Sequence, residues 1–189
     1  MNRIHNQLPA LKDLSAHNAA KSADSIAFED ASESVTWAEF EERSRRAANA
    51  LREHCAQGDR VAFLCDCSIA HTTLFNGAMK AGCVVSNLHT RASAETLRYC
   101  LDSIRPRVLV IDEQFSEFVE SDLRDEITTD LSAVITTGTE RADYEQSHEP
   151  LLESHEAVAP DVRVREERTQ VLVVEEPIVK IVHDGSDPL

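Results

Sequence analysis

The sequence predicts an α/β fold: a parallel, doubly wound sheet with helices on both faces, preceded by a leading helix and a small N-terminal hairpin. Three observations predict it. From Gly58 onward an apolar strand pattern is followed by a helical pattern three times over, as in successive βαβ units. Each strand is a near-continuous apolar run, which is typical of strands buried on both faces. Each connection is long enough for a right-handed crossover between parallel neighbours.

The segment before this alternation predicts the leading helix and the hairpin. Apolar residues at helical spacing predict a helix from about Pro9 to Lys21. The runs SIAFED and SESVT, separated by a turn at Ala31 to Glu33, predict two short antiparallel strands. The helical spacing is carried by Leu8, Leu11, Leu14 and Ala19.

A capping box marks the start of the next helix. The Thr36 hydroxyl can accept a hydrogen bond from the amide of Glu39, and the Glu39 carboxylate can accept one from the amide of Thr36. This helix is expected to end near Gly58. Its inward positions are Phe40, Ala47, Ala50 and Leu51, and its outward positions are Glu41, Glu42, Arg45 and Arg52.

The alternating region supplies the strands of the predicted sheet. Strands are expected at 60–65, 83–88 and 107–112, with a further one at 131–138. The intervening helices are expected to begin after Ser68 and Ser93, and the segment 115–123 is expected to be helical after the third strand.

The last quarter of the chain has a different character. We expect residues 1–140 to form an N-terminal α/β subdomain and residues 141–189 to form a polar linker plus an extended C-terminal segment. Pro150 and Pro160 interrupt the polar stretch, and β-branched residues return in the run VRVREERTQVLVVEEPIVKIV.

Composition limits the function classes. The 189 residues are enough for one ordinary domain, and 42% of them are hydrophobic. No run approaches the roughly 18 apolar residues of a membrane span. The opening residues lack the pattern of a signal peptide, so we expect a cytoplasmic location. Five cysteines are then expected to be reduced and mostly packed in the core.

The net charge of −15 is spread along the whole sequence, which indicates a solvated acidic surface. Nucleic acid is not an expected partner, because phosphate binding needs clustered lysines and arginines. The acidic surface suits a halophilic protein in a high-salt cytoplasm, where salt screens self-repulsion. An ordinary acidic bacterial protein remains the alternative.

Doubly wound sheets bind their ligands at the carboxyl ends of the strands. The expected site is therefore formed by the loops after Leu64, Leu88 and Ile111. None of these loops has a phosphate-binding glycine pattern, and the Gly185-Ser186 pair has no following helix or lysine. A self-contained nucleotide site is therefore not expected.

Several reactive side chains have both a functional and a structural interpretation. Cys65, Cys67 and His71 could bind a metal ion, but core packing of the cysteines is the favoured interpretation. Asp112 and Glu113 end a strand and could be functional, although solvation explains them more simply. The eight histidines show no ligand spacing, and no Ser or Cys is identifiable as a paired nucleophile. We therefore expect neither catalytic nor metal-binding residues.

Four blocks in a fixed order carry a family resemblance. They are IAFED with VTWAEF; GDRVAFL; the helix end KAG with CVVSNLHTR; and SAETLRYCLDSIRPRVLVID. In order and spacing they resemble the N-terminal part of the adenylate-forming superfamily of acyl-CoA synthetases, luciferases and peptide-synthetase adenylation domains. The resemblance covers Ile26 to Asp112 and extends to Gly138, with Leu8 to Lys21 as the leading helix.

The resemblance implies an activity and its cofactors. In the parent family, ATP and Mg²⁺ convert a carboxylate to an acyl-adenylate, and CoA then displaces AMP. The family's Ser/Thr/Gly-rich phosphate loop is expected where this chain reads KIVHDGSDPL, so no adenylation residue carries over. We expect none of these cofactors to bind well to the chain alone. Arg91 stands where some CoA ligases have an arginine near the CoA phosphates, but a solvated arginine before a helix is the favoured interpretation, and His89 departs from the usual Asn or Asp.

The leading hypothesis is therefore a truncated N-terminal fragment of an ATP-dependent acyl-CoA (fatty-acid or carboxylic-acid) ligase that is not catalytic alone. The alternative is a non-catalytic interaction or scaffold module, or one subunit of a split ligase. The implied partner is the missing remainder of the ligase or a second copy of the chain. A small independent nucleotide-binding protein is a third possibility, without a phosphate loop to support it.

Overall fold

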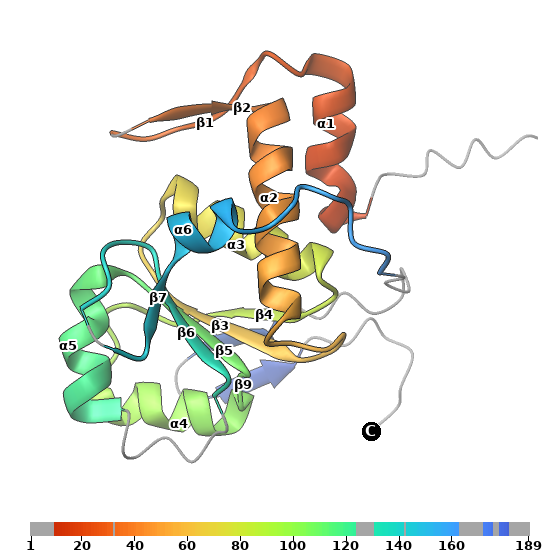
Figure 1. The fold of residues 1–189 in the computed structure, drawn as a ribbon. Coiled ribbons are helices and arrows are strands. Elements are labelled where there is room, and N and C mark those ends of the chain that lie inside the picture. Colours follow the sequence, from red (N-terminus) through yellow and green to blue (C-terminus); the bar gives the residue numbers. More distant parts are fainter. Residues whose placement is uncertain are drawn as a thin grey trace, which may run out of the picture.

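A five-stranded parallel sheet forms the centre of the protein (Figure 1). The structure is a computed structural model that describes residues 10–31, 33–123, 131–141, 143–162, 172–175 and 178–181. The strand order is β4-β3-β5-β6-β7, and all neighbouring pairs are parallel. The strands are β3 (Arg60–Leu64), β4 (Val84–Asn87), β5 (Val108–Ile111), β6 (Ala133–Thr136) and β7 (Glu145–Ser147).

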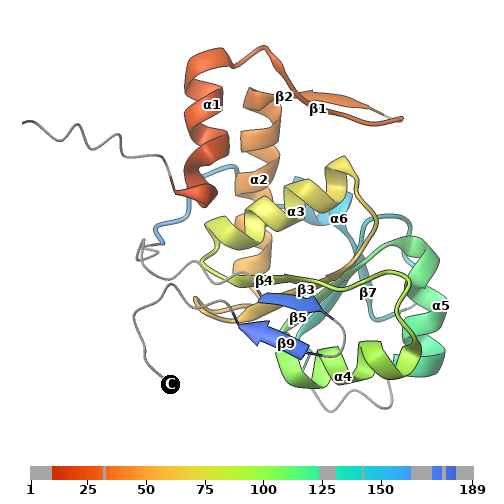
Figure 2. The same ribbon diagram turned by 180° about the vertical axis from the view of Figure 1, so that it is seen from behind.

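Helices cover both faces of the sheet, which confirms the predicted fold class (Figures 1 and 2). Helices α2 (Trp37–Arg52), α3 (Ile69–Lys80) and α6 (His148–Glu153) pack on one face. Helix α4 (Ala94–Ile104) covers the other face. The segment after β5 adds a short helical turn (Glu113–Phe115), α5 (Ser116–Phe118) and a π-helical turn (Val119–Leu123).

Alternation along the strands divides the core into two layers. Val61 and Phe63 of β3 point to the α2 and α3 side, whereas Ala62 and Leu64 point to α4. Strand β5 repeats this pattern, and its four residues are fully buried. Successive side chains of a strand face opposite sides, so a continuous apolar run supplies both layers at once.

Local capping fixes the starts of three helices as predicted. At α2 the Thr36 amide donates to the Glu39 carboxylate at 2.8 Å, and the Glu39 amide donates to the Thr36 hydroxyl at 3.3 Å. Ser68 and Ser93 cap α3 and α4 in the expected positions. Helix α2 ends at Arg52, earlier than the expected end near Gly58, and two turns fill the interval.

The N-terminal hairpin is confirmed, with β1 (Ile26–Glu29) antiparallel to β2 (Ser34–Thr36). It has a small core of its own, in which the rings of Phe28 and Phe40 lie 4.7 Å apart. The chain then enters α2 directly from β2, so the hairpin is held against the N-terminal end of that helix.

The leading helix is present but its packing differs from expectation. A short turn at Leu11–Asp13 precedes α1 (Leu14–Ser22), and the side chains of Leu11 and Leu14 are 48% and 40% exposed. The buried residue of α1 is Ser15. A polar contact, and not a leucine stripe, therefore holds this helix. Leu8 lies outside the described residues.

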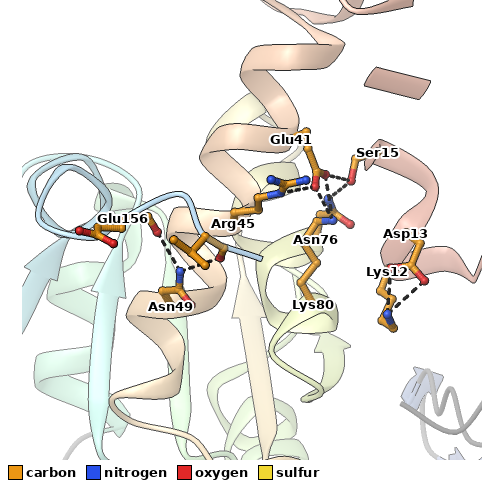
Figure 3. A network of polar contacts seen from close by, with 10 residues as sticks. Lys12, Asp13, Ser15, Glu41, Arg45, Asn49, Asn76, Lys80 and Glu156 are labelled. Carbon is orange, nitrogen blue, oxygen red and sulfur yellow. Dashed lines mark hydrogen bonds and ion pairs between the residues drawn. The ribbon is translucent and has the colours of Figure 1, made fainter. Parts of the chain in front are cut away.

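That contact belongs to a buried polar network between α1, α2 and α3 (Figure 3). The Ser15 hydroxyl donates to Glu41 at 2.7 Å, and Lys80 Nζ lies 2.8 Å from the same carboxylate. Asn76 Nδ2 donates to Ser15 Oγ at 2.8 Å, and Arg45 Nε donates to Glu41 at 2.6 Å. The prediction that Glu41 faces outward is wrong, because its partners on α1 and α3 enclose it.

The stretch expected to be a polar linker contains part of the sheet. Strand β7 pairs with β6, and α6 buries Leu152 against the core. The following residues run back over α2, where Arg46 donates to the His155 carbonyl at 2.7 Å and Asn49 to the Glu156 carbonyl at 2.8 Å. The prediction of a linker is therefore wrong for residues 145–153, which form β7 and α6. The division of the chain into 1–140 and 141–189 stays a prediction.

Of the predicted extended C-terminal segment, the structure describes two strands, β8 (Leu172–Glu175) and β9 (Ile178–Ile181), which pair antiparallel. The rest of that prediction lies outside the described residues. Strands β8 and β9 are near the β4 edge of the main sheet (Figure 2). Among the described residues, no helix combines the length and apolar character that crossing a bilayer requires.

Candidate functional site at the carboxyl edge of the sheet

Asp112 joins the loops that follow three strands. Its Oδ2 atom accepts a hydrogen bond from the Asp66 amide after β3 at 2.6 Å. Its Oδ1 atom accepts one from the Thr137 hydroxyl after β6, also at 2.6 Å. Asp112 is half-buried. The carboxylate at this strand end therefore has a definite role, to hold the loops together, and is more than a solvated surface group.

Glu113 joins the same edge to the loop after β6. It forms an ion pair with Arg141, whose Nε lies 3.0 Å from Glu113 Oε1, and it accepts the Thr139 amide at 3.2 Å. These two contacts hold the pKa of Glu113 below its usual range, and the Glu113 carboxylate raises the pKa of Arg141. A Cβ atom on Gly138 would lie 2.5 Å from Glu113 Oε2, so the loop approaches this carboxylate because residue 138 has no side chain.

A cavity of about 550 Å³ lies among these loops. Five carboxylate side chains and the two basic side chains Arg141 and His148 line it. The carboxylates are Asp30, Glu33, Asp112, Glu113 and Glu149. Arg141 is already paired with Glu113, so the cavity carries an excess of negative charge.

His148 does not offset this charge. Burial lowers the pKa of its imidazole, although the Glu149 carboxylate and a hydrogen bond to the Thr136 backbone act in the opposite direction. The ring is therefore neutral at pH 7. Its Nδ1 atom is buried and has no hydrogen-bond partner among the described residues.

A second cavity, of about 680 Å³, continues from the first between α2, α3 and α6. Its two arginines are engaged in ion pairs at its rim. Arg43 Nη1 lies 2.9 Å from both carboxylate oxygens of Glu33, and Arg46 Nη2 lies 2.9 Å from Glu42 Oε1. Neither guanidinium is therefore an unpaired cation. Together the two cavities make an acidic groove along the α6 side of the sheet edge.

Such a groove does not suit a polyphosphate. Phosphate sites present backbone amides, unpaired cations or a metal ion to the anion. Two backbone amides of the neighbouring loops, those of Asp66 and Thr139, are already donated to the lining carboxylates of Asp112 and Glu113. The side chains described here therefore do not fit the triphosphate of ATP.

Arg91, the predicted CoA contact, lies in the turn after β4. Its side chain is exposed, and its backbone amide donates to His89 Nδ1 at 3.1 Å. It is not one of the residues that line either cavity. A role toward the CoA phosphates stays a prediction.

The two cysteines and the histidine that follow β3 each have a different environment. Cys65 Sγ donates to the Val110 carbonyl at 3.5 Å, and burial raises the pKa of its thiol. Cys67 is exposed, so core packing is wrong for this residue. His71 Nε2 lies 3.2 Å from Asn87 Oδ1. Across the described ranges, no three His, Cys, Asp or Glu side chains are grouped so that they could hold a metal ion.

The loop after β6, which supplies Gly138, Thr139 and Arg141, was not among the predicted site loops. Its signal was the run TTGTE directly after an apolar strand, where a parallel sheet places its ligand loops. The assignment of a linker from residue 141 onward placed Arg141 and His148 outside the expected site.

Comparison with known proteins defines the class. A family profile described as AMP-binding enzyme matches residues 15–178. The chain therefore belongs to the AMP-binding enzyme family, and the predicted resemblance to the N-terminal part of acyl-CoA ligases is confirmed.

Individual relatives are acyl-CoA ligases. Over 99 residues the chain is 32% identical to a 3-hydroxybenzoate–CoA ligase of Aromatoleum sp. (strain CIB), an alignment that covers 52% of this chain and 19% of that protein. Over 136 residues it is 30% identical to a 4-hydroxybenzoate–CoA/benzoate–CoA ligase of Rhodopseudomonas palustris, covering 71% and 25%. The chain thus spans about a fifth to a quarter of the length of these relatives.

A solved structure shows the same fold. A long-chain-fatty-acid–CoA ligase from Archaeoglobus fulgidus superposes with a TM-score of 0.80 and 18% sequence identity over 93% of this chain and 36% of that one. At this identity the likeness concerns the fold alone.

Proposed function

We propose that this chain serves as the N-terminal subdomain of an ATP-dependent, AMP-forming acyl-CoA ligase, and that its 189 residues do not adenylate a carboxylic acid by themselves. The observation that carries the proposal is the family match over residues 15–178 on a sheet of the same fold. The reaction of such a ligase, for which Mg²⁺ is the expected metal cofactor, joins a carboxylate to AMP with release of pyrophosphate and then transfers the acyl group to CoA.

The acidic groove supports the proposal that this chain does not adenylate a carboxylic acid by itself. A triphosphate carries several negative charges, and the groove presents five carboxylates to a ligand at the carboxyl edge of β3, β5 and β6. Two like charges a few ångströms apart near a protein surface repel each other by about 4 kcal/mol. Binding of ATP therefore needs cationic or amide groups beyond those described here.

The substrate class is a carboxylic acid. The relatives named above are ligases of hydroxybenzoates and benzoate, and a further one, 27% identical, is a medium- and long-chain fatty-acid–CoA ligase of Mycobacterium marinum. Both aromatic and aliphatic acids belong in the test panel. Arg91 is the candidate contact to the CoA phosphates, which an Arg91→Ala exchange in an active ligase assembly would test.

The test is ATP–pyrophosphate exchange by the purified chain with benzoate, 3-hydroxybenzoate and a series of fatty acids. We expect no exchange above that of a protein-free sample. An active 3-hydroxybenzoate–CoA ligase in the same assay is the positive control. Exchange that depends on one of the acids would disprove the inactive-alone proposal.

A split ligase is the second candidate, and the β8–β9 hairpin favours it. A two-stranded ribbon is marginally stable alone, and its outer edges can pair with another chain. Size-exclusion chromatography in high salt distinguishes the candidates. A monomer that gains no activity from any neighbouring gene product counts against the split enzyme, and an active complex supports it.

A further inference from the structure

The cavity between α2, α3 and α6 combines acidic side chains with short apolar surfaces. Its volume of about 680 Å³ is room enough for a small organic molecule. Helix α3 contributes Ala70 and Thr73, which lie one turn apart on the same face of that helix. Helix α6 contributes Leu152 and the carboxylates of Glu149 and Glu153.

The two carboxylates on α6 have no cation opposite them. The arginines of α2 that line the cavity are engaged with Glu33 and Glu42. Within the described part of the chain, no ion pair joins Glu149 or Glu153 to a basic side chain. The two carboxylates stand at positions i and i+4 of the helix, where like charges repel each other. A ligand with two positive charges would remove this repulsion.

Two buried polar atoms at the cavity also have no partner. Thr73 is only 2% exposed, and its Oγ1 atom makes no hydrogen bond with any described residue. Nδ1 of the neutral His148 ring is in the same condition. Buried polar groups of native folds are nearly always hydrogen-bonded to protein, water or a ligand. Both side chains line the cavity, so a molecule held there can supply the missing hydrogen bonds.

We propose that this cavity binds a small aliphatic diamine in its doubly protonated form. One ammonium group pairs with Glu149 and the other with Glu153. Their N–H groups donate to Thr73 Oγ1 and to the Nδ1 lone pair of His148, which a neutral imidazole offers in one of its two tautomers. The methylene chain between the two ammonium groups contacts the apolar part of the wall.

The walls favour an organic cation over a metal ion. Ala70 and Leu152 offer carbon surface to methylene groups and no ligand atom to a metal. Nor does the described part of the chain hold a cluster of three His, Cys, Asp or Glu side chains that would bind one. Neither ATP nor CoA takes part in this site, so the inference stands apart from the proposed ligase activity.

Isothermal titration calorimetry of the 189-residue chain with 1,4-diaminobutane tests the proposal, at pH 7 in about 0.15 M KCl. Because the net charge is −15, any dication accumulates weakly around the chain, and only saturation at one ligand per chain counts as binding. We expect such saturation. The analogue butane-1,4-bis(trimethylammonium) has the same charge but no N–H group, so it should bind roughly tenfold more weakly or worse.

Thr73→Val is the sharpest variant, because valine keeps the shape of the side chain and removes only the hydroxyl. That hydroxyl has no partner among the described residues, so Tm should not fall. The Kd for 1,4-diaminobutane should rise roughly tenfold, which is the effect of one hydrogen bond from a charged donor. Glu149→Gln should weaken binding by a similar factor. The matched control is Glu95→Gln, an exposed carboxylate on α4 at the opposite face of the sheet, which should leave Kd unchanged.

Three results would overturn the proposal: no saturable binding, equal affinity for the quaternary analogue, or an unchanged Kd in Thr73→Val. Equal weakening by Glu149→Gln and Glu95→Gln would do the same, because the diamine would then respond only to the net charge of the chain.

Discussion

Glu41 and Lys80 form an ion pair inside the helical layer, with side-chain exposures of 8% and 7%. Removing such a pair from water has a large desolvation cost, which is offset only when the remaining polar atoms also find partners. Here Ser15, Asn76 and Arg45 supply those partners. The network therefore locks α1 onto α2 and α3 as long as both charges are present.

Exchange of Glu41 for glutamine should lower the free energy of unfolding by about 3–5 kcal/mol, because Lys80 would keep a buried charge without its counterion. Urea unfolding monitored by circular dichroism measures the change. Glu42→Gln is the matched control, since Glu42 forms an exposed i,i+4 pair with Arg46 and should cost at most about 1 kcal/mol. Similar losses for the two variants would contradict the role assigned to the network.

The same carboxylate predicts a pH dependence. Burial alone would raise the pKa of Glu41, but the hydrogen bonds from Lys80, Ser15 and Arg45 outweigh it and hold the pKa below the ordinary 4.5. A lowered pKa stabilises the fold fully above pH 4.5, and this stabilisation is lost as the pH falls through the folded-state pKa. Urea midpoints measured from pH 7 to pH 3 should therefore fall more steeply for the wild type than for Glu41→Gln. Parallel curves would show that Glu41 does not titrate as inferred.

Residue-level predictions from sequence succeed where the partners are local. The capping contact of Thr36 and Glu39 lies within one turn of helix, and the hydroxyls of Ser68 and Ser93 each act three residues ahead. Of the partners of Glu41, only Arg45 is local, whereas Ser15 and Lys80 lie 26 and 39 residues away, so the sequence around Glu41 does not indicate that this carboxylate is buried. Asp112 is similar, because its contacts come from loops that only the sheet brings together.

Helices α2 and α3 meet at an unusually close contact. A Cβ atom on Gly77 would lie 2.5 Å from Ala47 Cβ and 3.0 Å from the Ala48 amide nitrogen. A glycine in the middle of α3 weakens that helix by roughly 1 kcal/mol relative to alanine. The close approach of the two helices offsets this loss through their packing.

Gly77→Ala should therefore lower the free energy of unfolding by about 1–3 kcal/mol despite its better helix propensity. A double-mutant cycle with Ala47→Gly makes the test specific, because the second exchange removes the atom that the new methyl group would meet. We expect the double variant to lose less free energy of unfolding than the two single variants lose together. Strict additivity would show that the two positions are not coupled.

Among the helices and strands, those strands whose side chains are apolar could be predicted from the sequence. Strands β3, β5 and β6 carry unbroken apolar runs, which predict buried strands. Strand β7 reads Glu-Gln-Ser and is held by backbone pairing to β6, so hydrophobic pattern could not reveal it. Helix α6 is short and contains Pro150, so its sequence predicts a linker and not a helix.

For the whole molecule, the net charge of −15 should make stability depend on salt. Like charges spread over the surface repel each other in the compact state, and salt screens them over a Debye length of roughly 10 Å at 0.1 M and 3 Å at 1 M. Thermal unfolding at pH 7 should therefore shift to higher Tm by several degrees between 0.1 M and 1 M KCl.

The matched condition for this prediction is pH 4.9, the isoelectric point of the sequence. There the net charge is near zero and the same salt increase should have a much smaller effect. A Tm at pH 7 that is flat or falling with KCl would contradict the expectation of a salt-adapted surface and favour an ordinary acidic protein.

The strand order also bears on how the chain folds during synthesis. Strand β3 lies inside the sheet, where it pairs with β4 on one side and β5 on the other, and β6 and β7 then extend the β5 side in turn. Every strand after β3 thus docks beside one that the ribosome has already released. Parallel sheets are slow to form when distant strands must find each other. We expect this arrangement to let the sheet grow outward vectorially, strand by strand, as the polypeptide emerges.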